Sequence, residues 1–473
     1  MRTATLTAGA LGLLLGACSF APPYKVPESA PPPASYRELA QWKPAEPRDR
    51  APKGDWWIVF GDTQLNALEE QATQANQTLK AAFARLQQAR ADTRIARADL
   101  FPAITAQASG LRSRVSPNSP TYTPGNPTEG NDFNLEADFS YEVDLWGRVR
   151  NEIAAARANQ QASAADFAAL RLSVQAELAA DYFGLRSYDM QQQLLDKTVA
   201  DYRRSLDLTQ LLFNGGAAAL SDVEQARAQL HSAETQQADI HLQRAQMEHA
   251  IGVLVGENPS TFQLPINPLA PDATPPPIDP GMPSALLERR PDVAEAERRV
   301  AAANAQIGVA RAAYFPQFTL GASGGFNSVK AASWISAPSL FWSVGPQLSV
   351  PLFEGGRLVA QTARAKAAYE EQVATYRNTV LTAYRDVEDN LAALRQLQIE
   401  SNSQGQAVEA SNVALAKSQD RYLAGLVTYL EVASTETTAL QAQLSRINIL
   451  TRRLQASVLL VKALGGGWSA SGS

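Results

Sequence analysis

Residues 96–110 read A-R-A-D-L-F-P-A-I-T-A-Q-A-S-G, and residues 310–324 read A-R-A-A-Y-F-P-Q-F-T-L-G-A-S-G. The two stretches are related by a constant offset in residue number, 310 − 96 = 214. Further along, Val143–Arg148 returns as Val350–Arg357 with two residues inserted, and from there the offset holds at 357 − 148 = 209. A period this long indicates a duplicated domain and not a solenoid of short repeats.

The composition is that of a folded chain without a basic character. Of its 473 residues 45% are hydrophobic and 19% are charged, which is enough to bury a core. The net charge of −5 argues against nucleic-acid binding, which needs a basic surface. Beyond the first residues no apolar run reaches about 18 residues, so no transmembrane helix is expected and any membrane span must use strands.

The first residues indicate a processing signal. Arg2 is followed by a short apolar run at 8–15, and small residues precede Cys18, which is the only cysteine. This pattern resembles a bacterial lipoprotein box, in which the cysteine becomes the mature N-terminus and carries diacylglycerol and acyl groups. The alternative is a chance cysteine at the end of an ordinary signal. Ser19 stands where an aspartate would retain such a lipoprotein in the inner membrane, so the outer membrane is favoured.

Residues 132–145 predict the clearest strand, because apolar and polar residues alternate without interruption. A partner strand is expected near Ala103–Arg112, and the second half repeats the pair at about 316–327 and 341–352. A half-buried strand in a soluble sandwich would show the same alternation. The apolar side is composed of Phe133, Leu135, Ala137, Phe139, Tyr141, Val143 and Leu145. From Asn134 onward the other side carries four carboxylates, those of Glu136, Asp138, Glu142 and Asp144.

The expected strands have the length of outer-membrane strands, which need about 9–11 tilted residues. Four strands cannot close into a barrel, and an open sheet edge in lipid leaves backbone groups unsatisfied at a cost of several kcal/mol each. The smallest single-chain barrels use about eight strands. Membrane insertion would therefore require several copies to pool their strands, and three copies would supply about twelve.

Long proline-free stretches predict helices on both sides of each strand pair. The two longest contain about 66 residues, which corresponds to about 100 Å at 1.5 Å per residue. Each ends at a glycine-containing tip and is followed by a return helix. A soluble helical bundle would explain these helices but not the strand pairs. We expect the helices at about 76–100, 147–212, 221–255, 291–315, 357–423 and 429–464.

Proline-rich segments separate the two copies of the duplicated unit. Residues 257–283 hold nine prolines, which is typical of an extended linker. The expected layout is a signal peptide (1–17), an acylated proline-rich arm (18–61), a first structural repeat (62–256), the linker (257–283), a second structural repeat (284–464) and a flexible tail (465–473).

Three stretches carry a family resemblance: Tyr141–Arg148, Leu287–Val293 and Pro351–Arg357. With the lipoprotein box, they resemble the TolC-like outer membrane factors, in the OprM-like lipoprotein branch, over nearly all of the mature chain. The resemblance implies a mainly α fold with β, in which a homotrimer forms a twelve-stranded barrel through the outer membrane of a Gram-negative bacterium. This barrel is continuous with a helical barrel that extends across the periplasm.

The function implied by the resemblance is that of a passive exit duct in a tripartite efflux pump. The tips would dock on a periplasmic adaptor, or membrane fusion protein, served by an inner-membrane pump of the RND type. The exported molecules would be drugs or other small toxic compounds. The sequence does not specify the cargo, because solvents, metal ions and polypeptides also use ducts of this construction.

Two groups of residues are candidates for function in such a duct. The acidic side of the strand would face a water-filled lumen and favour cations. The lumen candidates are Glu136, Asp138, Glu142 and Asp144. The family's tip positions, for adaptor docking and the gate, fall at Gly215, Gly216, Gly425, Leu426, Val427 and Thr428. Several relatives carry an acidic residue where this chain has Val427 and Thr428, so the alternative to an acidic ring is an apolar constriction that divalent cations block little.

Enzymatic interpretations are disfavoured by local context. Residues 321–325 fit G-x-S-x-G, but a nucleophile elbow needs a strand-to-helix turn and Ser323 lies inside a strand pattern. His231, His241 and His249 lie on one expected helix at spacings that form no metal pair. We therefore expect no catalysis, no metal site and no cofactor beyond the groups on Cys18. The remaining alternative to a channel is a periplasmic lipoprotein scaffold with a soluble strand domain.

Overall fold

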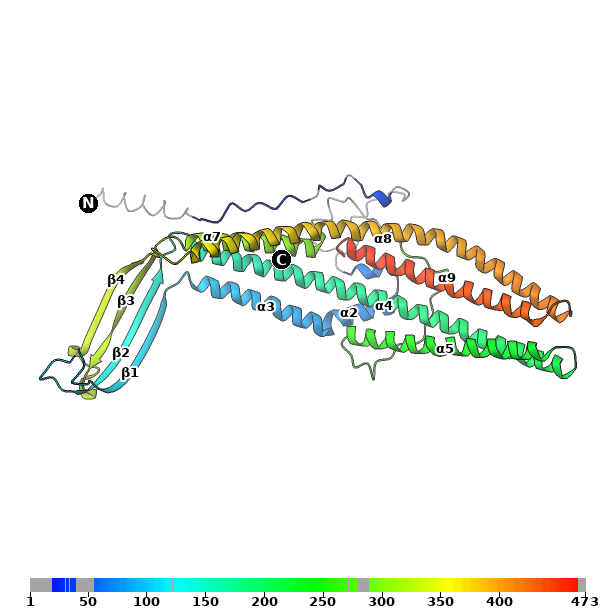
Figure 1. Cartoon of the computed structure of the whole chain (residues 1–473), viewed down its shortest axis with the longest axis horizontal. Helices are drawn as coiled ribbons and strands as arrows, with labels where there is room; N and C mark the ends of the chain where they lie inside the picture. Colours follow the sequence, from blue (N-terminus) through cyan, green and yellow to red (C-terminus); the bar gives the residue numbers. More distant parts are fainter. Residues whose placement is uncertain are drawn as a thin grey trace. The chain divides into compact units, whose positions relative to one another are not determined.

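The computed structural model describes residues 19–29, 31–33, 35–39, 55–120, 122–270, 272–278 and 289–466. The predicted signal peptide and Cys18 lie outside the described residues, as do part of the linker and most of the tail. Figure 1 labels the main elements. The helices are α2 Thr63–Ala75, α3 Gln77–Ala98, α4 Arg148–Asn214, α5 Leu220–Leu254, α7 Pro291–Ala312, α8 Arg357–Leu423 and α9 Tyr429–Ala463. The strands are β1 Ala103–Arg114, β2 Glu129–Glu142, β3 Gln317–Ser328 and β4 Leu340–Ser349.

Short 3₁₀ helices complete the described elements. They are η1 Arg37–Leu39, η2 Trp56–Phe60, η3 Ala331–Ser333 and η4 Ala337–Ser339. Residues 22–28 of the proline-rich arm have no regular secondary structure.

The two halves of the chain contain the same elements at the same lengths. Helices α3 and α7 have 22 residues each, α4 and α8 have 67 each, and α5 and α9 have 35 each. Each half follows the order helix, strand, strand, long helix, return helix. The predicted helix and strand order is therefore confirmed.

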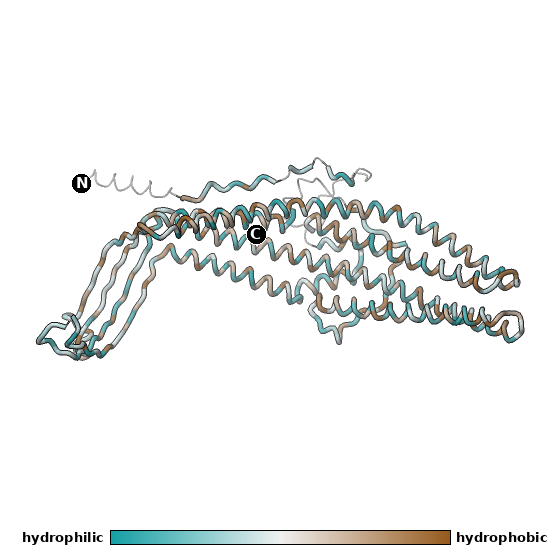
Figure 2. The backbone as a smooth tube through the Cα atoms, viewed as in Figure 1, coloured by the Kyte–Doolittle hydropathy of each residue, from teal (hydrophilic) through white to brown (hydrophobic). Residues whose placement is uncertain are grey.

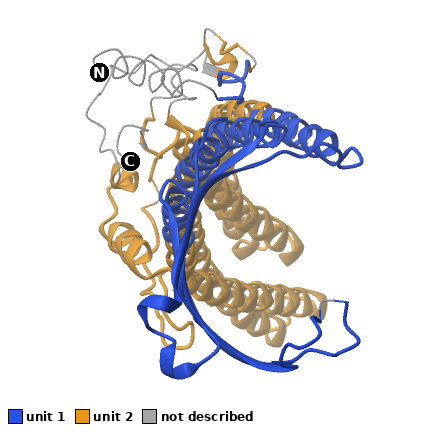
Figure 3. Ribbon diagram, turned by 90° about the vertical axis from the view of Figure 1, so that its left-hand side faces the viewer, with its two compact units in different colours: residues 1–28, 85–163, 295–376 blue, residues 29–84, 164–294, 377–473 orange. Residues whose placement is uncertain are grey.

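The chain forms two compact units, and each unit takes segments from both halves (Figure 3). Unit 1 comprises residues 1–28, 85–163 and 295–376, and unit 2 comprises residues 29–84, 164–294 and 377–473. The sheet belongs to unit 1, and the two helical tips belong to unit 2.

The sheet of unit 1 is antiparallel and curved, with the strand order β1-β2-β3-β4 (Figure 3). Two strand ends differ from the sequence-based expectation. The strand expected at 132–145 ends at Glu142, because Asp144 accepts hydrogen bonds from the first backbone amides of α4. The strand expected at 341–352 ends at Ser349, shortly before Pro351, which has no N–H to continue the ladder.

Unit 2 is held together by buried helix faces. Its main hydrophobic cluster joins Trp56 and Leu65 to Tyr182 of α4, Ile251 of α5 and Val458 of α9. Helix α8 buries an apolar face in this unit, where Val380, Val387 and Leu391 are fully inaccessible to solvent. Within the described residues, no helix holds a stretch that is long and apolar enough to cross a membrane, and Figure 2 shows hydrophobic and hydrophilic residues mixed along the helices.

In each half, the side chain of the residue just before α3 or α7 donates a hydrogen bond to the C-terminal end of the return helix, α5 or α9. Asn76 caps α3 by accepting a hydrogen bond from the Leu79 amide at 3.0 Å, and its Nδ2 donates to the carbonyl oxygen of Leu254 at 2.7 Å. Arg290 occupies the equivalent position in the second half, since 290 − 76 = 214. Its Nη1 donates to the carbonyl oxygen of Ala463, at 3.2 Å, and 463 − 254 = 209. The duplication therefore preserves this helix junction with a different side chain.

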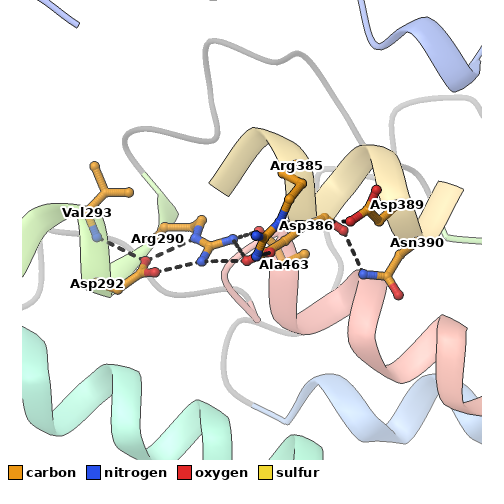
Figure 4. Close-up of polar contacts among 8 residues, drawn as sticks. All are labelled: Arg290, Asp292, Val293, Arg385, Asp386, Asp389, Asn390 and Ala463. Carbon is orange, nitrogen blue, oxygen red and sulfur yellow. Dashed lines mark hydrogen bonds and ion pairs between the residues drawn. The ribbon is translucent and has the colours of Figure 1, made fainter. Parts of the chain in front are cut away.

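The second junction contains more interactions than the first (Figure 4). The Arg290 guanidinium contacts Asp292 at 2.6 Å and Asp386 of α8 at 3.2 Å. Asp292 also accepts a hydrogen bond from the Val293 amide at 2.9 Å, in the first turn of α7, where a carboxylate stabilises the helix dipole. Arg290 is largely buried, and Asp386 has a second partner in Arg385, at 3.1 Å. One side chain thus links α7, α8 and α9.

Replacing Arg290 should destabilise unit 2 more than replacing Asn76. Arg290→Ala removes the charged donor that two carboxylates and a helix carbonyl share, and we expect a loss of about 2–3 kcal/mol in the free energy of unfolding. Asn76→Ala removes a neutral cap and should cost about 1 kcal/mol. Chemical denaturation of the purified protein, followed by circular dichroism, measures both. The neighbouring and exposed Arg289→Ala is the control, and equal losses at Arg289 and Arg290 would contradict the assignment.

Candidate functional site

The sheet presents one largely apolar and one largely polar face, although Leu111 and Phe341 fall in the polar rows and Arg112 in an apolar row. In one row across the strands, Ile104 pairs with Phe139, Phe139 with Ala322, and Ala322 with Val344. Directly paired residues point to the same side of a sheet, so each row belongs to one face. The apolar face carries Ile104, Ala106, Ala108, Phe133, Leu135, Ala137, Phe139, Tyr141, Phe318, Leu320, Ala322, Phe326, Leu340, Trp342, Val344 and Leu348.

The neighbouring rows form the polar face. Thr105 pairs with Asp138, Asp138 with Ser323, and Ser323 with Ser343. The hydroxyl oxygens of the two serines are 2.8 Å apart. The face carries Thr105, Gln107, Ser109, Asp132, Asn134, Glu136, Asp138, Ser140, Glu142, Gln317, Thr319, Ser323, Asn327, Ser343, Gln347 and Ser349. The alternation first seen in one stretch of sequence therefore extends over four strands.

The four predicted lumen carboxylates do not have the same surroundings. Glu136 and Asp138 lie on the polar face of β2. Glu142 ends the strand in a two-pronged ion pair with Arg148, with oxygen to nitrogen distances of 2.6 and 2.8 Å. Asp144 lies beyond the strand and contacts Arg150 at 3.0 Å. The sequence predicts one role for all four, but the structure pairs Glu142 and Asp144 with arginines in the first turn of α4.

Ser323, within the G-x-S-x-G match, lies inside β3 and not at a strand-to-helix turn. The three histidines lie on α5, and His231 contacts Glu234 one turn away at 2.9 Å. In the part of the chain that the structure describes, no group of His, Cys, Asp or Glu residues could hold a metal ion.

Both helical tips in unit 2 end with the same glycine motif. After α4, the Gly216 amide donates to the Phe213 carbonyl and the Ala217 amide to the Leu212 carbonyl. After α8, Gly425 and Leu426 repeat this pattern at the duplicate positions, with 425 − 216 = 209. The φ angles of Gly216 and Gly425 are +75° and +69°, in the left-handed region that glycine adopts without strain. The predicted tip residues thus lie in or directly after these two turns.

The structure also shows an acidic residue beside the second tip that the sequence analysis did not single out. Glu431 lies in the first turn of α9 and forms an ion pair with Arg421 of α8 at 2.7 Å. Leu426 is 70% exposed at the same tip, and Leu423 is 67% exposed. The tip therefore combines exposed leucines with a paired carboxylate, a mixture that neither an acidic ring nor a purely apolar constriction describes.

A buried carboxyl joins the two helical hairpins near their tips. Glu436 of α9 is 4% exposed, and its Oε2 accepts a hydrogen bond from Gln229 of α5 at 3.1 Å. Ser205 of α4 lies 3.4 Å from Oε1, and the Tyr429 hydroxyl lies 3.4 Å from Oε2. Around this group, Ala226, Tyr429, Val432 and Ala433 form a small hydrophobic cluster. The sequence signal was a carboxylate on an otherwise apolar helical stripe, at 429, 432, 433 and 436.

A strand sheet with one apolar and one polar face, carried by very long helices, defines a protein of the export-channel class. The model of the family described as outer membrane efflux protein matches residues 68–257 and 282–466. The chain belongs to this family of outer membrane proteins.

Individual relatives agree over nearly the full length. The pyoverdine export outer membrane protein OpmQ of Pseudomonas aeruginosa is 34% identical over 460 residues, which is 96% of this chain and 95% of that protein. The solvent efflux pump outer membrane protein SrpC of Pseudomonas putida is 34% identical over 471 residues, 97% of each. The crystal structure of the Campylobacter jejuni CmeC outer membrane channel superposes with a TM-score of 0.87 at 27% identity, covering 96% of each chain. The predicted fold class and family are confirmed.

The packing around Glu436 should weaken as the pH rises. Burial raises the pKa of this carboxyl from 4.5 to about 7. The groups facing it are Asp201 and Tyr202 of α4, Gln419 of α8 and Tyr429, besides Gln229 and Ser205. A raised carboxyl pKa contributes stability that is complete below pH 4.5 and is lost as the pH rises through about 7.

We expect amide hydrogen exchange at the start of α9, corrected for its intrinsic pH dependence, to accelerate by about tenfold or more between pH 5 and pH 8. Glu436→Gln, which cannot ionise, should remove this acceleration. Glu431→Gln, on the exposed side of the same helix, is the control and should retain it. An unchanged pH response in Glu436→Gln would refute the assignment.

Proposed function

We propose that three copies of this chain assemble into the outer membrane exit duct of a tripartite efflux pump. The observation that carries the proposal is the state of the sheet edges. Among the described strands, β1 pairs only with β2 and β4 only with β3, so both edges of a four-stranded sheet are open. Open edges in lipid cost several kcal/mol for each unsatisfied backbone group, and closure with other copies removes them.

The apolar face supports the same assembly. Ile104, Trp342 and Val344 are each more than 70% exposed in the single chain, although they are large apolar side chains. Facing lipid, they would be in a favourable environment, and the polar face would then line a water-filled interior. Two copies would supply eight strands and three would supply twelve. The family resemblance supports three.

In such a duct the described residues would have electrostatic and docking roles and would catalyse no reaction. Glu136 and Asp138 of three copies would place six carboxylates along the interior and favour cations. The tips of unit 2 would meet a periplasmic adaptor, and energy would come from an inner-membrane pump of the RND type. OpmQ and SrpC are equally similar to this chain but are named for different cargoes, so we assign cargo choice to the pump.

The mass of the protein extracted in mild detergent tests the proposal. We expect a particle of about three times the 50.9 kDa chain that conducts ions after insertion into a planar bilayer. A stable monomer would mean that the four strands need no partners, and it would support the periplasmic scaffold instead. An oligomer that does not conduct would also contradict the duct.

The two faces of β2 can be distinguished by a pair of neighbouring substitutions. Leu135→Arg places a charge on the proposed lipid face and should cost about 2–4 kcal/mol, so the variant should fail to accumulate in the outer membrane. Asn134→Arg places the same side chain on the polar face and should assemble. Heat-resistant oligomer in isolated outer membranes is the readout. Equal yields of the two variants would contradict the assignment of the faces.

We also propose that Cys18 carries diacylglycerol and acyl groups, as in bacterial lipoproteins. Ser19 and Phe20, the first described residues after it, are fixed against unit 1. The Ser19 hydroxyl donates to Asn151 at 3.1 Å, and the Arg311 guanidinium donates to the Phe20 carbonyl at 3.2 Å. Ser19 and Phe20, which follow the proposed lipidation site, thus lie beside the start of α4 and the end of α7.

Labelled palmitate should enter the wild-type protein and not Cys18→Ser. If the sheet alone holds the protein in the membrane, Cys18→Ser should still form oligomers there, although more slowly. Equal labelling of both proteins would exclude Cys18 as the acylated residue. Substituting Ser19→Ala is the control, because it removes a neighbouring hydrogen bond and keeps the cysteine.

A further inference from the structure

An aromatic cluster closes the junction between the end of β2 and the start of β3. Trp146, four residues after β2, packs on Phe315, two residues before β3, with ring centroids 5.0 Å apart and planes inclined by 29°. The Trp146 indole nitrogen donates to the carbonyl oxygen of Pro316 at 2.7 Å. Phe20 of the arm stacks on the other ring, with centroids 4.3 Å from Phe315. This cluster seals the β2–β3 seam where the sheet meets the helices of unit 1.

The chain carries the two main rings a second time, and within the described residues these copies stack on no other aromatic ring. Phe101 corresponds to Phe315 by the offset of 315 − 101 = 214, and it also lies two residues before its strand, β1. Phe353 corresponds to Trp146, because it lies four residues after its strand, β4. These rings are exposed: Phe101 by 71% and Phe353 by 90%. Phe101 and Phe353 are exposed although their duplicates, Phe315 and Trp146, pack on each other. This difference indicates that the equivalent contact is formed only in an assembly.

The strand order explains why the second pair stays apart within one chain. Trp146 and Phe315 meet because β2 and β3 are neighbours in the sheet. Phe353 follows β4 and Phe101 precedes β1, and these strands are the two opposite edges of the same sheet. Only a second copy, adding its β1 to the β4 edge, can bring the two rings together.

We propose that Phe353 of one copy packs on Phe101 of the next copy, as the counterpart between chains of the Trp146–Phe315 contact. The proposal rests on the proposed function, because it needs the open edges to be closed by copies of this chain. It adds the residues that complete the seam and the register in which the edges pair.

The same duplication defines the register. Within the chain, Glu142 of β2 pairs with Thr319 of β3. The duplicate of Glu142 is Ser349, since 142 + 207 = 349, and the duplicate of Thr319 is Thr105, since 319 − 214 = 105. By analogy, Ser349 of one copy pairs with Thr105 of the next. The offset of 207 is that of the strand side of the junction, 353 − 146.

The face pattern agrees with this register and excludes slips by an odd number of residues. It places Leu348 opposite Ala106 and Val344 opposite Gly110, which continues the apolar face across the seam. It places Gln347 opposite Gln107, which continues the polar face. A slip of one residue would set Val344 against the polar face of the next copy, and every later pair would be mismatched in the same way.

The seam between copies should be weaker than the seam within the chain. Phe353 has no indole N–H, so the Pro102 carbonyl, the duplicate of Pro316, lacks the donor that Trp146 provides. Each chain also has one arm, and its Phe20 is already stacked on Phe315. Restoring the donor by Phe353→Trp should therefore strengthen the assembly, whereas Phe353→Ala should weaken it.

Disulfide trapping in the full-length protein in outer membranes tests the register. Thr105→Cys with Ser349→Cys should give covalently linked copies under mild oxidation, because opposite residues have Cβ atoms about 4.5–5.5 Å apart. Gln107→Cys with Ser349→Cys is the matched control on the same face, where the diagonal separation of about 7–8 Å is too long for a disulfide. Linkage of the control pair in place of the first would overturn the register.

Heat dissociation of the oligomer tests the aromatic contact. We expect the dissociation temperature in detergent to fall for Phe353→Ala and Phe101→Ala and to rise for Phe353→Trp. Unchanged temperatures for all three variants would overturn the contact. A monomeric wild-type protein would instead overturn the proposed function, whereas a trimer that traps only the control pair would overturn this inference alone.

Discussion

The constraint on which the rest of the structure depends is the hydrogen bonding of an open sheet edge. Four strands leave the N–H and C=O groups along β1 and β4 without a ladder partner, and lipid offers none. One face of this sheet is nevertheless largely apolar. If this sheet lies in a membrane, as proposed, its edges need strands from other copies as hydrogen-bond partners.

Because the domain is duplicated, the same helix-end turns and helix junctions occur in both halves of the chain. The glycine motif that ends α4 ends α8, and the side chain that fastens α5 to α3 has a counterpart that fastens α9 to α7. The copies have diverged in chemistry and not in geometry. Asn76 is a neutral helix cap, whereas Arg290 contacts two carboxylates and a helix carbonyl. The two constant offsets in residue number are thus visible in three dimensions as equivalent contacts.

Much of the fold could be predicted because its signals are local. A period of two predicted the strands, the absence of proline predicted the long helices, and glycine predicted both tips. The sequence does not distinguish the four lumen candidates, because all four are carboxylates on the same side of one alternating stretch. Only the structure shows that Glu142 and Asp144 are paired with arginines. Glu436 and Arg290 depend on partners that are far away in the sequence, and no period along the chain reveals such contacts.

The two tips have the same backbone turn but different side chains. Leu220 begins the return helix of the first hairpin and is 56% exposed, whereas its counterpart Tyr429 is 1% exposed and packed. A ring of three chains would therefore present six hairpin ends of two alternating kinds. A partner surface that recognises one kind would bind with a stoichiometry of three, and a partner present in six copies would have to bind in two non-equivalent ways.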